Sequence, residues 1–232
     1  CVTKGLNPNV EMKDSGVEWI GEIPNGWKVN KFNRLVYFQE GPGLRTFQFT
    51  DEGTKVICVT NITEKGIDFS IFKKFISIDE YEEKYTHFTV QKGDLLLSSS
   101  GNSWGKVSEY KDDEKVMLNT STIRLNTYDE LKFVKNLIRY VLNSNFVRIQ
   151  LEILMTGSCQ PNFGPTHLNR LVIPVTPPTE QTQIVEYLDE QTQKIDSTIE
   201  KETQRIELLK EYRQSLISEV VTGKIDVRDY NG

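Results

Sequence analysis

The sequence contains little cysteine and histidine, with three cysteines and two histidines among 232 residues. Cys1, Cys58 and Cys159 are odd in number and far apart, which fits neither a disulfide framework nor a zinc cluster. Free thiols are typical of a reducing compartment, so we expect a cytoplasmic protein. No cysteine and histidine stand at the spacing of a nucleophile and its base. The sequence therefore predicts no catalytic residue and no metal site.

Long hydrophobic runs are also missing. No apolar run approaches the roughly 18 residues that a membrane span needs, so no membrane partner is expected. The first residues, Cys1–Gly5, contain no apolar segment and predict no secretory signal. They also lack an initiator methionine, so we expect a fragment or a processed piece. Hydrophobic residues make up 37% of the chain, which is enough for a core and too much for a disordered protein.

Positive charge is scarce near the end of the chain. Residues 1–175 hold 21 basic and 21 acidic residues, whereas residues 176–232 hold 7 basic and 12 acidic residues. The last part therefore carries the whole net charge of −5. This balance excludes nonspecific polyanion binding by the entire surface, but it leaves room for a local nucleic-acid site in the first part.

The region from Lys28 to Leu125 is mostly strand-like. Val56–Thr60 is a β-branched run, and Leu95–Leu97 is a short buried strand. The segments 106–110 and 122–125 alternate like the two strands of a hairpin. After them, apolar spacings of three and four predict one amphipathic helix from Glu130 to Met155, and Leu171–Val175 is a last strand.

The segment 180–221 contains neither proline nor glycine and predicts one helix of about 42 residues. Thr179 is the expected N-cap and Gly223 the stop signal. Isoleucine recurs every 11 residues, which gives a nearly straight apolar stripe. So narrow a stripe on so long a helix predicts a partner helix. The expected helix-pairing residues are Ile184, Leu188, Ile195, Ile199, Ile206, Leu209, Leu216 and Val220.

The two ends of the chain resemble each other. Val2–Val10 and Val221–Val227 both contain Val-Thr, then glycine and lysine in swapped order, then an aliphatic residue and a valine. This similarity between the two ends is expected if the chain is one unit of a tandem duplication, cut at the junctions between the repeats.

Motif tests exclude several chemistries. The spacing Gly101–Lys106 has three residues between its glycines and Val107 after its lysine, so it is not a P-loop. The sequence has no Gly-x-Gly-x-x-Gly, and Gln160–Phe163 has the wrong order for a DNA amino-methyltransferase loop. One alternative stays open: Asp94, Glu109 and Lys111 have the spacing of a metal-dependent nuclease core.

Polar loops between the expected strands indicate nucleic-acid binding. The alternative interpretation is that these loops are simply solvent-exposed. Arginine and glutamine read guanine and adenine edges, small hydroxyls approach phosphates, and an indole can stack. Lys106 is expected to contact a phosphate. The candidate DNA-binding residues are Arg45, Thr46, Gln48, Thr60, Asn61, Ser98, Ser99, Ser100, Asn102, Trp104, Lys106, Gln160 and Asn162.

Four segments together resemble the specificity subunit of type I restriction-modification systems. Met12–Pro24 is similar to the segment that opens a target recognition domain in that family, and Gly93–Gly101 to its Gly-Asp strand and loop. Pro174–Gln181 looks like the start of its long helix, and Leu209–Ile225 looks like the end of that helix. The likeness covers nearly the whole chain.

The resemblance implies an α+β fold: a mixed globular DNA target recognition domain followed by one long coiled-coil-forming helix. We expect residues 1–16 to be the tail of a preceding helix or a linker, and residues 17–178 the recognition domain. Residues 179–222 would be the long helix, and 223–232 a C-terminal tail. A full subunit of the family has two domains and two helices, so this chain resembles the C-terminal half.

The resemblance also implies a non-catalytic role, in which the chain reads one half of a bipartite DNA target. Its expected partners are double-stranded DNA, modification subunits, restriction subunits through the complex, and a second recognition half or a second copy through the helix. The chain itself would bind no cofactor. S-adenosylmethionine, ATP and magnesium ions would belong to the partner subunits. The alternatives are the nuclease above and a coiled-coil adaptor that binds only protein.

Overall fold

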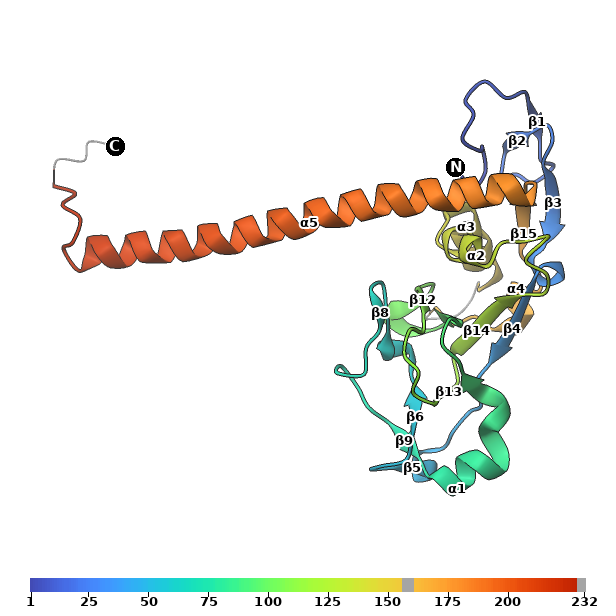
Figure 1. Cartoon of the computed structure of the whole chain (residues 1–232), viewed down its shortest axis with the longest axis horizontal. Helices are drawn as coiled ribbons and strands as arrows, with labels where there is room; N and C mark the ends of the chain where they lie inside the picture. Colours follow the sequence, from blue (N-terminus) through green and yellow to red (C-terminus); the bar gives the residue numbers. More distant parts are fainter. Residues whose placement is uncertain (156–160, 229–232) are drawn as a thin grey trace. The chain divides into compact units, whose positions relative to one another are not determined.

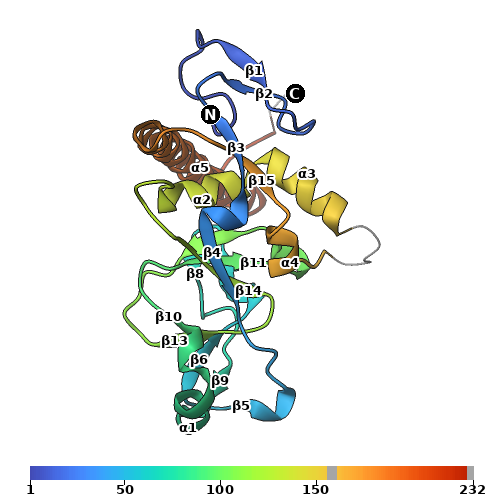
Figure 2. The same cartoon turned by 90° about the vertical axis from the view of Figure 1, so that its right-hand side faces the viewer.

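The computed structural model describes residues 1–155 and 161–228, and the chain divides into two units, Cys1–Val185 and Glu186–Gly232. Short strands and helices share the first unit, and one helix fills most of the second. The α+β fold class is therefore confirmed. In Figure 2 the hairpin of β1 (Met12–Asp14) and β2 (Glu22–Pro24) lies at one end of the first unit, and α1 (Ile78–Glu80) and β5 (Phe49–Thr50) lie at the other.

Two small sheets form the N-terminal end of the first unit. Strand β1 (Met12–Asp14) pairs antiparallel with β2 (Glu22–Pro24), and β3 (Lys28–Lys31) pairs antiparallel with β15 (Val172–Val175). The boundary expected at residue 16 falls inside the first hairpin. Residues 1–10 form turns, with Gly5 in the left-handed region (φ 69°).

A four-stranded antiparallel sheet lies in the middle of the unit, in the order β12, β11, β14, β4. Its strands are β4 (Val36–Glu40), β11 (Leu95–Ser98), β12 (Val107–Glu109) and β14 (Thr122–Thr127). The hairpin expected between the strands now seen as β12 and β14 is wrong, because both pair with β11. All four residues of β11 are buried, and such a strand takes the centre of a sheet.

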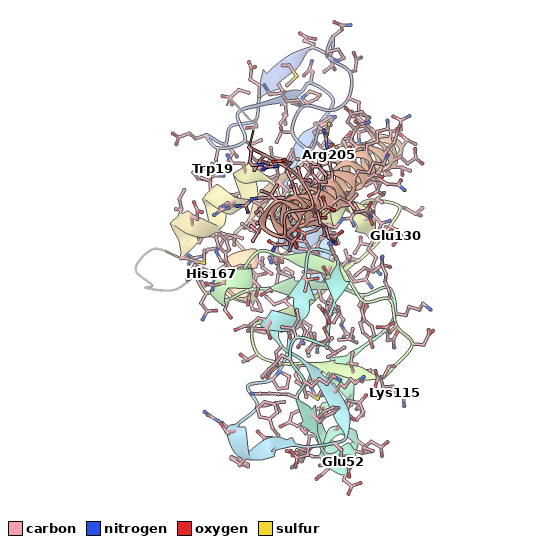
Figure 3. All side chains as sticks on the ribbon, turned by 90° about the vertical axis from the view of Figure 1, so that its left-hand side faces the viewer. Trp19, Glu52, Lys115, Glu130, His167 and Arg205 are labelled. Atoms are coloured by element: carbon pink, nitrogen blue, oxygen red, sulfur yellow. The ribbon has the colours of Figure 1, made fainter. Side chains whose placement is uncertain are left out.

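A five-stranded sheet forms the other end of the unit, in the order β10, β13, β6, β9, β5. Its strands are β5 (Phe49–Thr50), β6 (Thr54–Ile57), β9 (Phe75–Ile76), β10 (Thr89–Val90) and β13 (Val116–Leu118). Strands β6 and β13 run parallel, so the chain leaves them at the same edge, through Cys58 and Asn119. Glu52 and Lys115 in Figure 3 mark this end of the unit.

The core of the unit lies between these two sheets. Ile57, Leu96 and Leu118 are fully buried members of one apolar cluster. The small hairpin of β7 (Ile62–Thr63) and β8 (Gly66–Ile67) closes this cluster on one side.

Four short α-helices accompany the sheets: α1 (Ile78–Glu80), α2 (Lys135–Leu142), α3 (Asn145–Leu154) and α4 (Pro165–Leu168). A π-helical turn, η4 (Tyr81–Tyr85), continues α1, and single 3-10 turns occupy η1 (Phe32–Arg34), η2 (Thr46–Gln48), η3 (Val59–Asn61), η5 (Thr86–Phe88) and η6 (Gly101–Ser103). The single helix expected over 130–155 is wrong, since α2 and α3 are separate. Ser144 takes an extended conformation (ψ 149°) between them.

The long helix α5 (Pro178–Val221) is confirmed and runs unbroken in Figure 1. Its 44 residues span about 66 Å. It begins one residue before the expected N-cap, at Pro178, and the amides of Glu180 and Gln181 bond to the carbonyl of Pro177. It ends as expected, because Gly223 is left-handed (φ 74°) and the amide of Lys224 donates to the carbonyl of Glu219.

The first two turns of α5 belong to the first unit. The observed division therefore falls after Val185, whereas the expected boundary stood after residue 178. Ile184 and Val185 are buried there. The fully buried Gln181 accepts a hydrogen bond from the amide of Val134 (2.8 Å) and donates to the carbonyls of Lys132 (3.0 Å) and Thr176 (2.7 Å). The Gln181 side chain therefore ties three segments of the first unit together.

We predict that Gln181→Leu lowers the free energy of unfolding by about 2–5 kcal/mol, because it leaves three buried main-chain groups without partners. Gln183→Leu, at an exposed position on the same helix, is the matched control and changes stability by less than about 0.5 kcal/mol. Urea unfolding followed by circular dichroism measures both. Equal stability of the two variants would contradict the role given to Gln181.

Candidate nucleic-acid interface

The turn between β13 and β14 stands at the centre of a group of loops. Its Ser121 is in the left-handed region (φ 60°), the one non-glycine residue there among 1–155 and 161–228. Two neighbours hold it: Glu40 Oε1 accepts from the Ser121 amide (2.9 Å), and the amide and hydroxyl of Ser99 donate to its carbonyl (2.9 and 3.0 Å). Strained non-glycine residues of this kind are often found at functional sites.

The polar loop after β11 is joined to two other loops. Ser100 forms a bridge with Asn162, and the amide of Phe163 donates to the carbonyl of Ser99 (3.0 Å). On the other side, the hydroxyl of Ser103 donates to the carbonyl of Val59 (3.0 Å). The structure thus brings together four loops, 58–61, 98–103, 119–122 and 161–164.

Three of the expected DNA-binding residues, Thr60, Asn102 and Asn162, are exposed on these joined loops, and Ser100 is half-buried between them. Their side chains are hydroxyls and amides carried by short loops next to strands. Such groups can read base edges once the scaffold fixes their geometry. We therefore call Thr60, Ser100, Asn102 and Asn162 the polar loop cluster.

Trp104 and Lys106 follow this cluster along the chain. The Trp104 ring meets Phe163 edge-on, with centroids 6.2 Å apart, and the Arg148 guanidinium lies 5.3 Å from its centroid. Trp104 is therefore half-buried and held from two sides. Lys106 lines a cleft of about 450 Å³ together with Lys65 and the β7–β8 hairpin. Glu64 and Asp68 line the same cleft, so it carries two ammonium groups and two carboxylates.

Four of the expected DNA contacts are corrected by burial or by occupied hydrogen bonds. Asn61 is fully buried, accepts from the Cys58 amide (2.9 Å) and donates to the carbonyls of Asp68 and Phe72 (2.9 and 2.7 Å). Ser98 and Ser99 are also fully buried. These three side chains hold loops in place, so none of them offers a free group to a ligand.

Gln48 is corrected for the same reason. Its Oε1 accepts from the Arg45 amide (2.8 Å), and its Nε2 donates to Glu80 (2.7 Å) and to the hydroxyl of Tyr85 (3.0 Å). Arg45 and Thr46, at the start of this 3-10 turn, are exposed as expected. Gln160 lies outside the described residues.

Several basic and aromatic side chains near the Arg45 turn were not expected from the sequence. The Lys74 ammonium lies 4.0 Å from the centroid of Phe49 and 5.4 Å from that of Phe72. Phe47 is exposed on the turn itself. The three phenylalanines and two lysines gathered in 69–75 are the sequence signal that was missed, whereas Arg148 gave none because it sits on an ordinary amphipathic helix.

Cys58 lies where the chain leaves β6, next to the joined loops. Burial raises the pKa of its thiol, while a hydrogen bond from Asn119 and the charge of Lys74 oppose this shift. The thiol is therefore protonated and unreactive near neutral pH. This favours a packing role for Cys58, as expected for a free cysteine in a core.

The nuclease alternative has no support in the geometry. The Asp94 carboxylate accepts from the Gln91 amide (2.8 Å) and lies 3.7 Å from Arg124. Glu109 is paired with Leu95, so the alternation of strand side chains places it on the other face from Asp94. Within residues 1–155 and 161–228, no three His, Cys, Asp or Glu side chains gather as metal ligands would.

Comparison with known proteins decides the family. Residues 24–210 match the family described as the type I restriction modification DNA specificity domain. The chain belongs to this family. The resemblance stated from the sequence is thus confirmed.

Members of this specificity-domain family are similar to the chain over most of its length. It is 26% identical over 99% of its length to the type I restriction enzyme MjaVIII specificity subunit of Methanocaldococcus jannaschii, and covers 52% of that protein. It is 30% identical over 88% of its length to the StySPI specificity subunit of Salmonella potsdam, and covers 44% of it. The chain therefore spans about half the length of these relatives.

Solved structures of type I systems share the fold. A chain from a study of complex assembly and conformational transition of the type I R-M system gives a TM-score of 0.64 at 15% identity, over 93% of this chain and 48% of the other. The HsdS subunit from Thermoanaerobacter tengcongensis gives 0.53 at 17% identity, over 80% and 41%. Among the described helices, none combines the length and the hydropathy that a membrane crossing requires.

We predict that Asn61→Ala destabilises the protein, whereas Ala at its exposed neighbour Thr60 does not. Asn61→Ala removes three buried hydrogen bonds and lowers the free energy of unfolding by about 2–4 kcal/mol. Thr60→Ala leaves stability within about 0.5 kcal/mol of the wild type. Denaturant titration of both variants is the measurement. A stable Asn61→Ala protein would show that the loop does not depend on this amide.

Proposed function

We propose that residues 1–185 recognise a specific double-stranded DNA sequence and read one half of a bipartite target within a type I specificity subunit. The observation that carries this proposal is the convergence of four loops whose exposed tips are hydroxyls and amides, on a scaffold fixed by buried side chains. Membership of the specificity-domain family supports it.

The exposed side chains divide by chemistry into two roles. Arg45, Thr46 and the polar loop cluster carry the groups that read base edges. Lys106 and Lys65 are cations that suit phosphates and carry no base information, and Glu64 and Asp68 line the same cleft. Trp104 contacts Phe163 and the Arg148 guanidinium, so its role is to fix the loop as well as to contact DNA.

The chain acts as a non-catalytic subunit in this proposal. Modification subunits would supply adenine methylation with S-adenosylmethionine, and restriction subunits would supply ATP-dependent cleavage with magnesium ions. The rival adaptor function, in which the chain binds only protein, predicts no sequence-specific DNA binding even with modification subunits present. Methylome sequencing of cells that carry the intact system supplies the target duplex for the tests below.

We predict that Arg45→Ala weakens binding of the target by about 1–3 kcal/mol and relaxes discrimination at one base pair. Lys106→Ala weakens binding to all duplexes alike. It also lowers, by about one, the slope of the logarithm of the binding constant against the logarithm of the salt concentration. Fluorescence anisotropy with the assembled methyltransferase, on single-base target variants at several salt concentrations, measures both effects.

The two variants control for each other, because each removes one positive charge. Uniform weakening of every target variant by Arg45→Ala would mean that Arg45 contacts the DNA backbone. Absence of any sequence preference in the wild-type complex would refute the recognition function itself.

We also propose that α5 pairs with a similar helix, either from the other recognition half or from a second copy. Its stripe residues beyond Leu188 are exposed, from Ile195 to Leu216. Exposed apolar residues at this spacing are stabilised when a partner helix covers them. The excess of acidic residues in 176–232 opposes contact between this helix and phosphates.

The end of α5 exposes more apolar surface than one partner helix covers. Leu208 and Tyr212 are both exposed and lie about one helical turn apart. At 100° of rotation per residue, their side chains project about 80–140° around the helix axis from the centre of the apolar stripe. Leu216 lies between this second ridge and the stripe. This ridge is the surface that we assign to the modification subunits.

We predict that the double change Ile195→Asp and Ile206→Asp dissociates the self-associated chain into monomers, because it buries two charges in the helix seam. Gln193→Asp with Gln204→Asp is the matched control, since it adds the same charges at the same 11-residue spacing on the opposite face. Sedimentation equilibrium measures the mass. A monomeric wild type at high concentration, or dissociation by both double variants, contradicts pairing through the stripe.

A further inference from the structure

Glu40 places a carboxylate beside the joined loops. It is the last residue of β4 and pairs with Ile123 on β14, next to the β13–β14 turn. The four joined loops contain no charged residue of their own. Glu40 therefore brings a single negative charge to a group of loops whose side chains are otherwise neutral.

The two carboxylate oxygens of Glu40 have different surroundings. Oε1 accepts a hydrogen bond from the Ser121 amide (2.9 Å). Oε2 faces the loop 161–164, because a Cβ atom at Gly164 would come within 3.2 Å of it. Within residues 1–155 and 161–228, Oε2 has no hydrogen-bond or ion-pair partner. A carboxylate oxygen is an acceptor only, so Oε2 is available to a donor from outside the chain.

The main chain that carries this carboxylate is fixed. A Cβ atom at Gly41 would lie 2.4 Å from the carbonyl oxygen of Asn119, so the chain after Glu40 runs directly against the β13–β14 turn. The Gly41 amide also donates to the carbonyl of Thr122 (3.1 Å). The half-buried Glu40 side chain is therefore oriented before any ligand binds, which lowers the entropy cost of binding.

Support of the strained Ser121 turn explains only half of this arrangement. The Ser121 amide needs one acceptor, and a neutral glutamine would supply it as well as a glutamate does. A half-buried carboxylate costs more desolvation than a neutral amide, and Glu40 has no ion-pair partner among the described residues to offset that cost. The second oxygen and the charge gain a partner only when a ligand brings a donor.

The negative charge selects the part of a duplex that Glu40 contacts. Phosphates repel a carboxylate, which excludes the DNA backbone. In the major groove, cytosine presents its N4 amino group as a donor, and glutamate is a suitable acceptor for it. Adenine presents an amino group too, but its N7 acceptor stands beside that group and repels a carboxylate. The chemistry therefore favours cytosine.

We propose that Glu40 reads a cytosine of the target, with Oε2 accepting a hydrogen bond from the N4 amino group in the major groove. This inference rests on the proposed DNA recognition. Oε1 stays on the Ser121 amide, so the same carboxylate supports the turn and reads the base. Glu40 adds base discrimination, and its charge adds nothing to the general attraction for DNA.

Glu40→Gln separates the two roles. The Ser121 amide is a donor, so it orients the new side chain with Oε1 toward Ser121 and leaves the Nε2 amino group in the place of Oε2. The turn keeps its support, while the reading group changes from an acceptor to a donor. Glu130→Gln is the matched control, because it removes the same charge at an exposed position on a separate segment.

Fluorescence anisotropy with the assembled methyltransferase compares the target, its single-base variants and duplexes in which 2-pyrimidinone replaces one cytosine at a time. This analogue lacks the N4 amino group. The wild type and Glu130→Gln bind about ten-fold or more weakly when one particular amino group is missing. Glu40→Gln loses this difference and prefers, at the same base pair, a base that presents an acceptor. Its discrimination at all other pairs is unchanged.

A second set of variants separates reading from support of the turn. Glu40→Ala removes both, and loss of the support strains Ser121. Adding Ser121→Gly relieves that strain, because glycine adopts a positive φ readily. We expect the double variant to fold as the wild type does, by thermal unfolding, and to lack discrimination at the cytosine. Ser121→Gly alone keeps Glu40 and retains the discrimination.

Three outcomes overturn the proposal. The first is a Glu40→Gln complex that discriminates at every base pair as the wild type does. The second is equal weakening of all duplexes by Glu40→Gln. The third is a double variant that regains discrimination at the cytosine, which would limit Glu40 to supporting the turn. All three leave DNA recognition standing, whereas a wild-type complex that does not prefer its target refutes the proposed function itself.

Discussion

Buried amide side chains that bond only to main-chain groups hold this recognition unit together. Asn61, Gln150 and Gln181 each satisfy their carbonyl oxygen and amino group on main-chain atoms of segments far along the chain or across a loop. The strands are only two to six residues long, so their ladders leave much backbone unpaired. The amides supply partners to that backbone, and the loops become as well defined as the strands. The polar loop cluster depends on this arrangement.

The same principle explains why strain is tolerated at the centre of the site. Ser121 is held left-handed by a carboxylate on one side and a serine on the other, both reaching its main chain. Because the parallel strands β6 and β13 end at one edge, the segments after them meet there and receive support from β4 and β11. In the described structure the buried side-chain oxygen Oδ1 of the neighbouring Asn119 has no hydrogen-bond partner, whereas its main-chain oxygen accepts from Thr122. Fixed positions of this kind let short side chains present polar groups at defined distances.

The sequence predicted the elements whose signals are local, and it failed where the outcome depends on which way a side chain points. The absence of proline and glycine over 180–221 and the stop at Gly223 located α5 to within two residues at either end. The loops were located as well, since serine, asparagine and glycine gather in them. An amide in such a loop can bind a base or another part of the protein equally well, however. Asn61 bonds to main-chain groups, and Gln48 bonds to the Arg45 amide and to the side chains of Glu80 and Tyr85. The place of β11 between β12 and β14 also escaped prediction, because strand order depends on contacts between distant segments.

The 11-residue repeat of α5 restricts how the length of the helix can vary. Eleven residues turn the helix by about 1100°, within roughly 20° of three full turns, and advance it by about 16 Å. Insertion or deletion of seven residues also keeps the stripe within roughly 20° of whole turns, whereas most other small numbers of residues rotate one part of the stripe away from the other. The 11-residue step of about 16 Å is close to the rise of five base pairs of B-form DNA. A DNA half-site spacing that changed by one such step would change by about half a helical turn of the duplex, which alternates the face of the DNA that the two half-sites present.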